Sequence, residues 1–470
     1  MVRRLIAQYV YHKEIETLPG QKDSPVTKPH VLLVNPWIHD FAAYDFWARP
    51  MGLLALAGLL RKAGWEVSFI DCLDRFHPRQ PQTDPNQRRG RGPFVKTPIE
   101  KPSGLSDVKR HFSRYGIPPD WFQADLADSA PPDLILVTSL MTYWYTGVKE
   151  TIEVIKKIWP APPLVLGGIY ASLCMEHARD HSGADRVITG PGEKSVLELA
   201  ARISGGSPPA GFDPQDLDSA PYPAFDLQHR VSYVPILTSR GCPFKCTYCA
   251  SHLIEPRRLV RSPDAVIEEI RYWHERFAVS DFVLYDDAFL ADATRHALPL
   301  LEKIVRDNLD IRFHTPNAVH VRGITEETAG LMFRAGFKTL RLGLETTDFE
   351  DRDALDRKVT EAEFQKAAAA LKSAGFKKDQ IGAYLLAGLP GQPLESIAAS
   401  IETVQQAGIT PIPAYYSPIP GTALWPEAVN ASRYDLESDP LFTNNAILPC
   451  VPGPFSWDYI AKIKKLVAIG

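Results

Sequence analysis

The sequence contains no apolar run long enough to span a membrane. Its longest apolar stretch, Met51 to Leu60, is about half of the roughly 20 residues that a bilayer requires, and Arg49 and Arg61 bracket it. The first part of the chain, MVRRLIAQYVYHKEIETLPG, holds neither a long apolar core nor a small-residue cleavage site, so it does not resemble a secretory signal. We therefore expect a cytoplasmic protein without a transmembrane segment, and a buried helix at 51–60.

The chain also lacks an excess of charge of either sign. Its 52 Lys and Arg residues nearly balance its 56 Asp and Glu residues, which leaves a formal net charge of -4. This composition implies no polyanion partner, so no nucleic acid is expected to bind. One basic tract, QRRGRGPF (87–94), lies in a Pro-, Arg- and Gln-rich insertion at about 75–132. Because the tract is short and poor in aromatic residues, a solvated or partly disordered insertion is favoured over a nucleic-acid interface.

Cysteine is scarce, with six residues in the chain. Cys72, Cys174 and Cys450 are isolated and offer no disulfide framework, which agrees with a reducing compartment. We expect these three to pack as small apolar side chains, although the role of Cys450, in the Pro-rich stretch ILPCVPGP, stays open. The other three cysteines stand together in RGCPFKCTYCAS (240–251) and require a separate explanation.

Three thiols in this loop, Cys242, Cys246 and Cys249, suit neither a disulfide nor a complete zinc site. A disulfide uses two cysteines and would leave one over. A structural zinc site requires four N or S donors, and only His252 is near enough to complete one locally. A [4Fe-4S] cluster has four irons, so three thiolates can hold three of them and leave the fourth open to a substrate or cofactor. The spacing therefore favours a [4Fe-4S] cluster over zinc.

The first half of the chain alternates apolar strands with helices. Continuous runs of β-branched residues and Leu predict a parallel sheet that is covered on both faces. We expect an α/β, Rossmann-like domain at 29–203 after an N-terminal extension at 1–28, and a linker at 204–230. The expected strands are 30–36, 65–71, 133–139, 163–169 and 185–190, and the expected helices are 51–64, 148–159, 174–181 and 192–203.

From residue 231 the alternation begins again and repeats six times. Six consecutive βα units predict a partial (β/α)6 TIM-type barrel at 231–425, followed by a short C-terminal helical cap at 426–470. In such folds the chemistry lies at the C-terminal ends of the strands, and the cysteine loop follows the first strand directly. The expected strands are 234–239, 281–287, 311–317, 339–346, 381–388 and 410–416.

The stretch CPFKCTYC, placed after the first strand of a barrel, resembles the CxxxCxxC loop of the radical S-adenosylmethionine (SAM) superfamily. The resemblance implies that Cys242, Cys246 and Cys249 ligate a [4Fe-4S] cluster, with Tyr248 of the same loop among the cofactor-binding residues. It further implies that the amino and carboxylate groups of SAM bind the open iron. An electron donor such as flavodoxin or ferredoxin then supports cleavage of SAM to methionine and a 5'-deoxyadenosyl radical.

Strand alternation tests whether the rest of the barrel agrees. In TLRLGLET (339–346) the three leucines share one face, so Glu345 faces the barrel interior if the leucines pack on helices. The family's glutamate in a GxE pattern after the fourth strand matches Glu345, which implies contact with the ribose or ammonium group of SAM. The alternative is a structural ion pair of Glu345 with Arg341 or Arg312.

Two further barrel segments resemble the SAM-binding motifs of the family. DFVLYDD places Asp286 and Asp287 on opposite faces, so at most one of them faces the cofactor, and the other is expected to cap a helix. AGLPGQPLE contains Gly388, which resembles the Gly-rich turn that approaches adenine, although a simple turn role is equally open. YYSPIPGTALW, with Pro418, resembles the end of the sixth strand.

The first domain resembles the cobalamin (B12)-binding domain that precedes the barrel in one branch of this superfamily. The matching segments are LLVNP, LVLGGIYAS and DRVITGPGEKSVLEL, and the resemblance implies cofactor contacts at Gly167, Gly168, Gly190 and Glu193. The Asp-x-His-x-x-Gly pattern that supplies a histidine to cobalt in other cobalamin proteins is absent. The bulky loop IHDFAAYDFWARP (38–50) could either cradle a corrin or fill its place.

These features predict a radical SAM enzyme that uses cobalamin to methylate an unactivated carbon of a small molecule or lipid precursor. The alternative is radical cyclisation, rearrangement or carbon–carbon coupling with a relic B12-like domain. A methylthiotransferase is disfavoured, because Cys72, Cys174 and Cys450 are too scattered to hold a second cluster. A non-catalytic iron–sulfur sensor or cobalamin carrier is the least favoured hypothesis.

Overall fold

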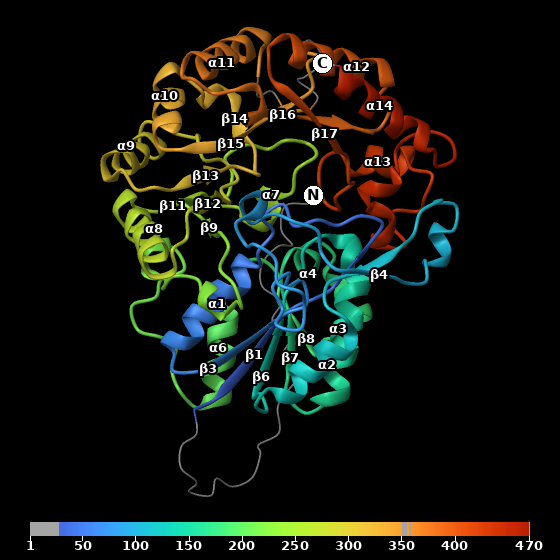
Figure 1. Ribbon diagram of the computed structural model, residues 1–470. Helices are drawn as coiled ribbons and strands as arrows, with labels where there is room; N and C mark the ends of the chain where they lie inside the picture. The colour runs from blue at the N-terminus through green and yellow to red at the C-terminus, as the bar shows by residue number, and fades with distance from the viewer. Residues whose placement is uncertain (1–27, 350–354, 357–358, 470) are drawn as a thin grey trace, which may run out of the picture.

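The computed structural model describes residues 28–349, 355–356 and 359–469, so the predicted extension at 1–28 lies almost wholly outside the described residues. Two layered α/β units meet along one junction (Figure 1). The first contains the blue and green strands in the lower half of the view, and the second contains the yellow and orange strands above them. In the described part of the chain, no helix has both the length and the apolar character needed to cross a membrane.

Five parallel strands form the sheet of the first unit, in the order β3-β1-β6-β7-β8. Alternate residues of β1 belong to two different cores: Leu32 and Val34 pack with helices α2 and α3, whereas Val31 and Leu33 pack with α1 and α6. The continuous apolar strands are therefore buried on both faces, as predicted. The strand order reverses between β1 and β6, which is where open α/β sheets bind ligands.

The predicted strands and helices occur in the predicted order, but β7 and β8 are shorter than expected, and α2 and α4 were not predicted. The strands are β1 (His30–Asn35), β3 (Glu66–Asp71), β6 (Leu134–Val137), β7 (Leu164–Leu166) and β8 (Arg186–Val187). The helices are α1 (Met51–Lys62), α2 (Pro119–Asp128), α3 (Tyr145–Ile158), α4 (Ile169–Leu173), α5 (Met175–His181) and α6 (Glu193–Ser204), and a 3-10 turn η3 (Thr142–Trp144) precedes α3.

The insertion at about 75–132 is folded and packed, so the expectation of a solvated or partly disordered segment was wrong. Phe112 and Ile117 are buried, and Phe122 of α2 contacts the edge of Trp37 with ring centroids 5.0 Å apart. The sparse apolar residues of this segment were too widely spaced to show a period, but many of them, such as Phe94, Leu105, Val108 and Leu126, are buried. The insertion contributes η1 (Gln87–Gly90), η2 (Ser103–Leu105) and the strands β4 (Lys96–Pro98) and β5 (Ser113–Tyr115), which form a three-stranded antiparallel sheet with β2 (Ile38–Asp40).

Glu150 of α3 ties this small sheet to the first unit. Its carboxylate lies 2.8 Å from His39 Nε2 of β2 and accepts a second hydrogen bond from Nε of Arg114 on β5 at 2.9 Å. Burial alone would raise the pKa of Glu150, but these partners outweigh it and lower the pKa to about 2. The stability that this carboxylate contributes is therefore present above its ordinary pKa and is lost as the pH falls from about 4.5 towards 2.

We accordingly expect Glu150→Gln to lower the free energy of unfolding by about 2 kcal/mol at pH 7, because a neutral amide forms weaker bonds with Arg114. Urea unfolding of both proteins at pH 7 and at pH 3.5 measures the effect. The difference between them should shrink at pH 3.5, where part of the wild-type carboxylate is protonated in the unfolded chain. An equal difference at both pH values would contradict the assignment.

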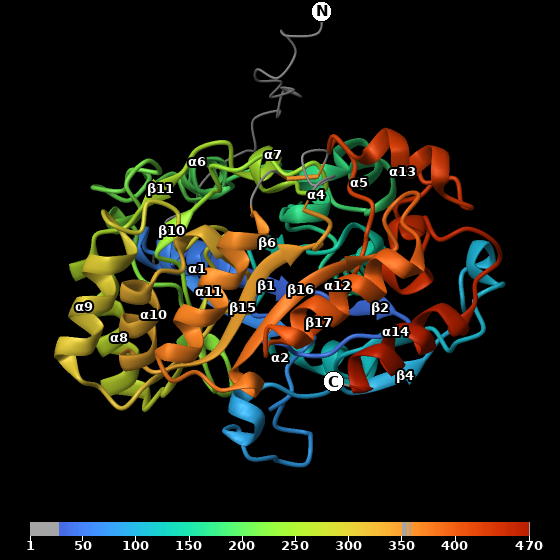
Figure 2. The ribbon, with the colours of Figure 1, turned by 90° about the horizontal axis from the view of Figure 1, so that it is seen from above.

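The second unit is an open barrel of parallel strands in the order β9-β12-β13-β15-β16-β17, with the short β14 paired to β15. In the described residues the first and last strands of this order do not pair, so the barrel is partial, as predicted. Helices follow the outer side of the strands (Figure 2). Two of them, α10 and α11, begin with capping boxes at Thr325 and Thr360, which satisfy their first backbone N–H groups.

The bounds of the barrel elements follow the predicted βα repeats. The strands are β9 (Val234–Ile236), β12 (Asp281–Leu284), β13 (Arg312–His314), β14 (Val319–His320), β15 (Phe337–Glu345), β16 (Ile381–Ala387) and β17 (Thr410–Tyr415). The helices are α8 (Pro263–Phe277), α9 (Ala297–Asp307), α10 (Glu326–Arg334), α11 (Glu361–Ser373) and α12 (Leu394–Gln406).

The C-terminal segment joins the two units. It contains α13 (Trp425–Ala431), η9 (Pro440–Thr443) and α14 (Trp457–Ile469), and α14 packs on α12 of the barrel. From the same segment, Asp439 accepts a hydrogen bond from Tyr145 of the first unit at 2.9 Å, and Asn444 donates one to Asp40 at 2.9 Å. The predicted cap therefore also fastens the first unit to the barrel.

Candidate functional site

The cysteine loop lies at the C-terminal end of β9, at the junction of the two units. A short antiparallel ribbon, β10 (Ser239–Arg240) with β11 (Leu259–Val260), and the helix α7 (Ser251–Ile254) frame the loop. Gly241 begins it with a φ of +81°, and a Cβ atom there would lie 2.3 Å from the carbonyl oxygen of Arg257. Only glycine permits this close backbone approach, so Gly241 fixes the entry into the loop.

Cys246 is buried, whereas Cys242 and Cys249 are partly exposed. None of the three forms a disulfide, and the Cys249 sulfur accepts a long hydrogen bond from the backbone N–H of Ser251 at 3.5 Å. Burial raises the pKa of Cys242, and the negative charges of Asp287, Cys246 and Cys249 raise it further. The thiols are therefore close enough to influence one another, and a bound cation would favour their thiolate forms.

The donor set fits an iron–sulfur cluster rather than a single metal ion. In the part of the chain that the structure describes, no three His, Cys, Asp or Glu side chains converge in a way that could hold one ion. A cubane cluster bonds each thiolate to a different iron, so its ligands do not need to converge on one atom. The residues present therefore fit a [4Fe-4S] cluster with one iron left free of a protein ligand.

The two adjacent aspartates that follow β12 have different environments. Asp286 is buried and accepts hydrogen bonds from Thr238 N at 3.1 Å and from the hydroxyl groups of Thr238 and Ser239, both at 2.6 Å. It thereby anchors the segment that leads into the cysteine loop. Asp287 is exposed, and its carboxylate interacts with Ser251 and with Cys242.

The expected helix cap at one of the two aspartates was wrong. The helix that follows, α9, begins after His296 and has no side-chain cap. The Asp286 carboxylate instead accepts its hydrogen bonds from Thr238 and Ser239, which follow β9. These donors reach the carboxylate only when the barrel is folded. Asp287 is thus the aspartate on the side of the cysteine loop that is available to a ligand.

Glu345 ends β15 on the inner face of the barrel. The leucines at 340, 342 and 344 are fully buried in the core beneath the helices, so the opposite face of the strand points inward. Glu345 has a φ of +65°, a left-handed conformation that is unfavourable for a residue with a side chain. A Cβ atom at Gly343 would lie 3.2 Å from Glu345 Oε1, so the glycine of the GxE pattern leaves room for the carboxylate.

One partner of Glu345 comes from the cysteine loop. The Tyr248 side chain hydrogen-bonds to Glu345, and burial followed by the charge of Glu345 raises the pKa of Tyr248 well above its usual value. Of the two alternative arginine partners, Arg312 pairs with Asp281 at 2.6 Å, and Arg341 donates to the carbonyl oxygen of Leu340 at 3.1 Å. The structural ion pair that we considered for Glu345 therefore does not explain its position.

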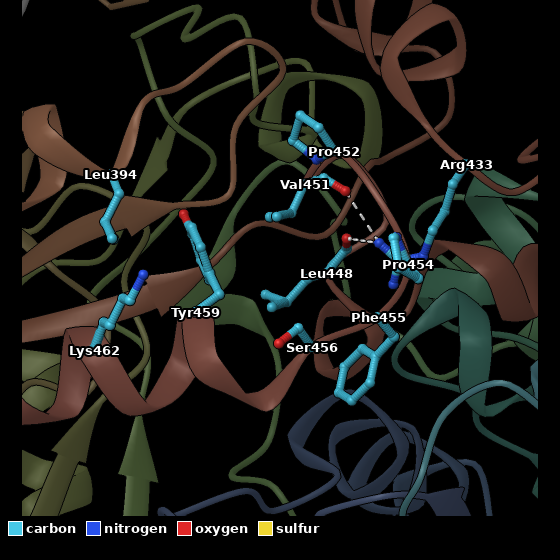
Figure 3. Close-up of a pocket in the computed structure, with 10 residues that line it drawn as sticks. All are labelled: Leu394, Arg433, Leu448, Val451, Pro452, Pro454, Phe455, Ser456, Tyr459 and Lys462. Atoms are coloured by element: carbon cyan, nitrogen blue, oxygen red, sulfur yellow. Dashed lines mark hydrogen bonds between the residues drawn. The ribbon is translucent and has the colours of Figure 1, made fainter.

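Gly388, in the turn after β16, lies against the C-terminal cap. Its φ is +85°, its N–H donates to Gln392 at 2.9 Å, and a Cβ atom there would lie 3.3 Å from Val451. Val451 and Leu448 also line a cavity of about 180 Å³ (Figure 3). Arg433, at the same cavity, donates hydrogen bonds to the carbonyl oxygens of both residues and so stabilises this part of the cap. Pro418 is buried in the segment after β17. The adenine role of Gly388 stays a prediction.

The predicted cobalamin contacts lie along the C-terminal edge of the first sheet. Gly168 has a φ of +97°, and a Cβ atom there would lie 2.2 Å from the carbonyl oxygen of Ser139, so this glycine is required by the turn. Gly167 precedes it, and Gly190 donates its N–H to Ser172 Oγ at 2.9 Å. Glu193, at the start of α6, forms a 2.8 Å ion pair with Arg240. Glu193 is therefore a link between the units in this structure.

The loop at 38–50 lies mainly in the junction between the first unit and the barrel, rather than along the C-terminal edge of the first sheet. Its Trp47 is buried and stacks on His314 of β13, with ring centroids 4.5 Å apart. The loop after β6 instead leaves Leu140 and Met141 about 40% exposed, beside the Ser139 carbonyl that contacts Gly168. Exposed apolar side chains at the point where the strand order reverses suit a flat, largely apolar ligand such as a corrin.

Sequence reasoning did not identify Leu140, Met141, Thr238, Ser239 or Arg240. The first two were visible as apolar residues directly after a switch-point strand, in SLMTYW, and this signal could have been used. The other three carry no local signal, because their importance comes from partners that are distant in the chain. Cys72 and Cys450 are buried as expected, whereas Cys174 is partly exposed.

Two family models match parts of this chain, one in each unit. The radical SAM superfamily matches residues 236–404, and the B12 binding domain matches residues 116–200. An uncharacterized methyltransferase of Pyrococcus horikoshii is 26% identical over 63% of this chain and 70% of its own length. Cytidylyl-2-hydroxyethylphosphonate methyltransferase of Streptomyces wedmorensis is 21% identical over 95% of this chain and 91% of its own.

Solved structures show the same fold over most of the chain. TsrM from Kitasatospora setae, a radical S-adenosylmethionine methyltransferase with cobalamin and a [4Fe-4S] cluster bound, aligns with a TM-score of 0.62 at 19% identity. The alignment covers 86% of this chain and 78% of that one, so the likeness includes both units and not the barrel alone.

Proposed function

Since the chain is a radical SAM protein with an N-terminal B12-binding domain, we propose that it is a cobalamin-dependent radical SAM methyltransferase. Its substrate is a small molecule or lipid precursor that is methylated at an unactivated carbon. The observation that carries the proposal is the direct contact of the two units: Glu193 pairs with Arg240 beside the cysteine loop, and α4 contacts α7. Figure 1 shows α4 and α7 at the centre of the molecule, between the sheet and the barrel.

The cysteine loop would hold the [4Fe-4S] cluster through Cys242, Cys246 and Cys249. When bound and reduced, the cluster supplies the electron that cleaves SAM into methionine and a 5'-deoxyadenosyl radical. Asp287, which hydrogen-bonds to Ser251 of the loop, would accept hydrogen bonds from the ammonium group of SAM, and Glu345, held by Tyr248, would bind its ribose or ammonium group. Asp286 orients the loop. Gly388 and Pro418 complete this proposed set.

The edge of the first sheet would hold cobalamin, which when methylated supplies the methyl group. Leu140 and Met141 offer an apolar surface, and Gly167, Gly168 and Gly190 let the backbone approach a large ligand closely. The methyltransferase names of the relatives support methyl transfer for this chain. A small carrier protein such as flavodoxin or ferredoxin is proposed to donate the electron. The reaction is proposed to take place in the cytoplasm.

A cobalamin titration tests the proposal. The cluster is first reconstituted anaerobically, and the protein is then mixed with hydroxocobalamin and passed through a gel-filtration column. We expect it to retain about one cobalt per chain, because the edge of the first sheet and its contact with the barrel are both present in the folded chain. Met141→Glu should reduce the retained cobalt at least tenfold at unchanged iron content, since it places a charge on the apolar surface. Val95→Glu, which changes an exposed apolar residue of the insertion, is the matched control.

Wild-type protein that retains no cobalt would overturn methyl transfer and would leave a first unit that serves as a scaffold. The radical SAM assignment would still stand in that case. The reaction would then be a radical rearrangement, cyclisation or coupling that needs no methyl donor.

A further inference from the structure

The basic tract of the insertion reaches into the barrel. Arg88, Arg89 and Gly90 all have positive φ values, of 52°, 58° and 82°, which fold the tract into a tight turn. Arg89 donates to the carbonyl oxygen of Lys338 and to Thr339 Oγ1, both at 3.3 Å, so the turn is anchored on the first residues of β15. The tract therefore forms a contact between the insertion and the barrel, which no local feature of the sequence predicted.

Arg91 follows this turn and lies at the inner face of the barrel. Its guanidinium stacks over Trp47, with Cζ 4.6 Å from the ring centroid, and Trp47 stacks in turn on His314. His314 is fully buried and contacts Asp281 at 2.9 Å and Thr339 at 3.0 Å, which belong to β12 and β15. These contacts hold Arg91 close to three neighbouring strands.

Arg341, on β15, is near enough to Arg91 for the two positive charges to interact. It lies on the inner face of the strand, between the helix-facing Leu340 and Leu342. Its Nη1 lies 3.1 Å from the position of a Cβ atom on Gly382, the residue that is paired with it on β16. The glycine thus makes room for the guanidinium. Both Arg91 and Arg341 remain partly exposed, so a small ligand can reach them.

The two arginines have no carboxylate partner. Among the ion pairs of the described residues, Arg91 and Arg341 form none, and Asp281, whose charge acts on Arg91, is already paired with Arg312 and His314. Burial lowers the pKa of Arg341, and Arg91 lowers it further, against a partial offset from Tyr384. Burial and the charges of Arg89 and Arg88 also lower the pKa of Arg91, with partial offsets from Tyr44 and Asp281. Two partly desolvated, mutually repelling cations are unfavourable unless an anion neutralises them.

We propose that Arg91 and Arg341 bind a phosphate or phosphonate group of the substrate. A tetrahedral dianion matches two uncompensated positive charges, and guanidinium groups bind its oxygens in a bidentate manner. A carboxylate would neutralise only one of the two charges. The inference deepens the proposed function and rests on it, because it names the class of substrate that the same barrel accepts.

The position of the arginine pair limits the size of the substrate. Glu345 lies four residues beyond Arg341 on the same inner face, which corresponds to about 13 Å between the Cα atoms. Gly343 lies between Arg341 and Glu345 on that face, and it has no side chain to separate these two residues. The anionic group of the substrate is therefore expected to lie deeper in the barrel than the SAM group at Glu345, and within about 13 Å of it.

The test uses the full chain with its cluster reconstituted and inorganic phosphate as the probe. At constant ionic strength, we expect phosphate to raise the unfolding temperature of the wild type, with half of the effect at a concentration at least tenfold below that required for acetate. Arg341→Gln and Arg91→Gln should each weaken phosphate binding about 10- to 100-fold, which is the loss of charge-assisted hydrogen bonds. Arg334→Gln, which removes an exposed arginine from α10, should leave binding unchanged.

A second measurement requires no variant. Phosphate should protect Arg91 and Arg341 from modification by butanedione, as followed by mass spectrometry, while Arg334 reacts at the same rate with and without it. Equal protection of all three arginines, or an equal response of the Arg91, Arg341 and Arg334 variants, would overturn the site. So would the absence of any phosphate effect on the wild type.

The failure of this inference can be distinguished from the failure of the proposed function. If the wild type cleaves SAM and retains cobalamin but phosphate has no effect, only the substrate class is wrong. If phosphate binds at the two arginines but no 5'-deoxyadenosine forms, the anion site stands and the radical chemistry does not.

Discussion

Replacement of Cys246 by alanine is expected to abolish both cluster assembly and the formation of 5'-deoxyadenosine. Cys246 is the buried member of the three loop cysteines, so loss of its thiolate leaves two ligands, which are too few to hold a cube of four irons. The chain itself should fold, because alanine in place of a small buried thiol costs only on the order of 1 kcal/mol. Iron content should fall from about four per chain to near zero.

Anaerobic reconstitution, followed by iron and sulfide analysis and by chromatography of the nucleoside product under dithionite, measures both effects. Cys174→Ala is the matched control, since it removes a partly exposed thiol that lies outside the loop. The control should assemble a full cluster. A Cys246→Ala protein that retained either the cluster or nucleoside formation would refute the assignment of the loop.

The two neighbouring aspartates are expected to give opposite results when each is changed to asparagine. Asp286→Asn should lower the free energy of unfolding by about 3 kcal/mol and impair cluster assembly. An asparagine amide group would face the N–H of Thr238, so the buried site would lose at least one charge-assisted bond and gain an unsatisfied donor. The loop that Asp286 anchors through Thr238 and Ser239 would then be misplaced.

Asp287→Asn should leave both the fold and the cluster intact. Its carboxylate is exposed and interacts with the loop only through Ser251 and the charge of Cys242. We expect its KM for SAM in the formation of 5'-deoxyadenosine to rise about 10- to 100-fold, the effect of losing one charge-assisted hydrogen bond to the ammonium group.

Urea unfolding, iron content and the KM for SAM, measured on both variants, separate the two roles. If Asp287→Asn destabilised the chain while Asp286→Asn changed only the KM, the two assignments would have to be exchanged. Equal effects of both changes would refute the distinction.

The sequence by itself determined the elements that depend on local spacing. Three cysteines at 242, 246 and 249 after a strand predicted a cluster-binding loop, and continuous apolar strands alternating with helices predicted both sheets. Alternation in β15 correctly placed Glu345 on the inner face. These inferences succeeded because chain geometry over a few residues fixes which side chains share a loop or a face.

Only the tertiary structure decided which partners meet. It showed that Asp286 is used by the loop after β9, that Glu193 pairs with Arg240, and that the basic insertion is packed against the barrel. Arg91 and Arg341 stand far apart in the sequence, and neither has a local pattern that refers to the other. Such contacts depend on how the two units dock, although each unit can be predicted separately. The free energy of docking is a sum over many side-chain contacts, so no single sequence spacing predicts it.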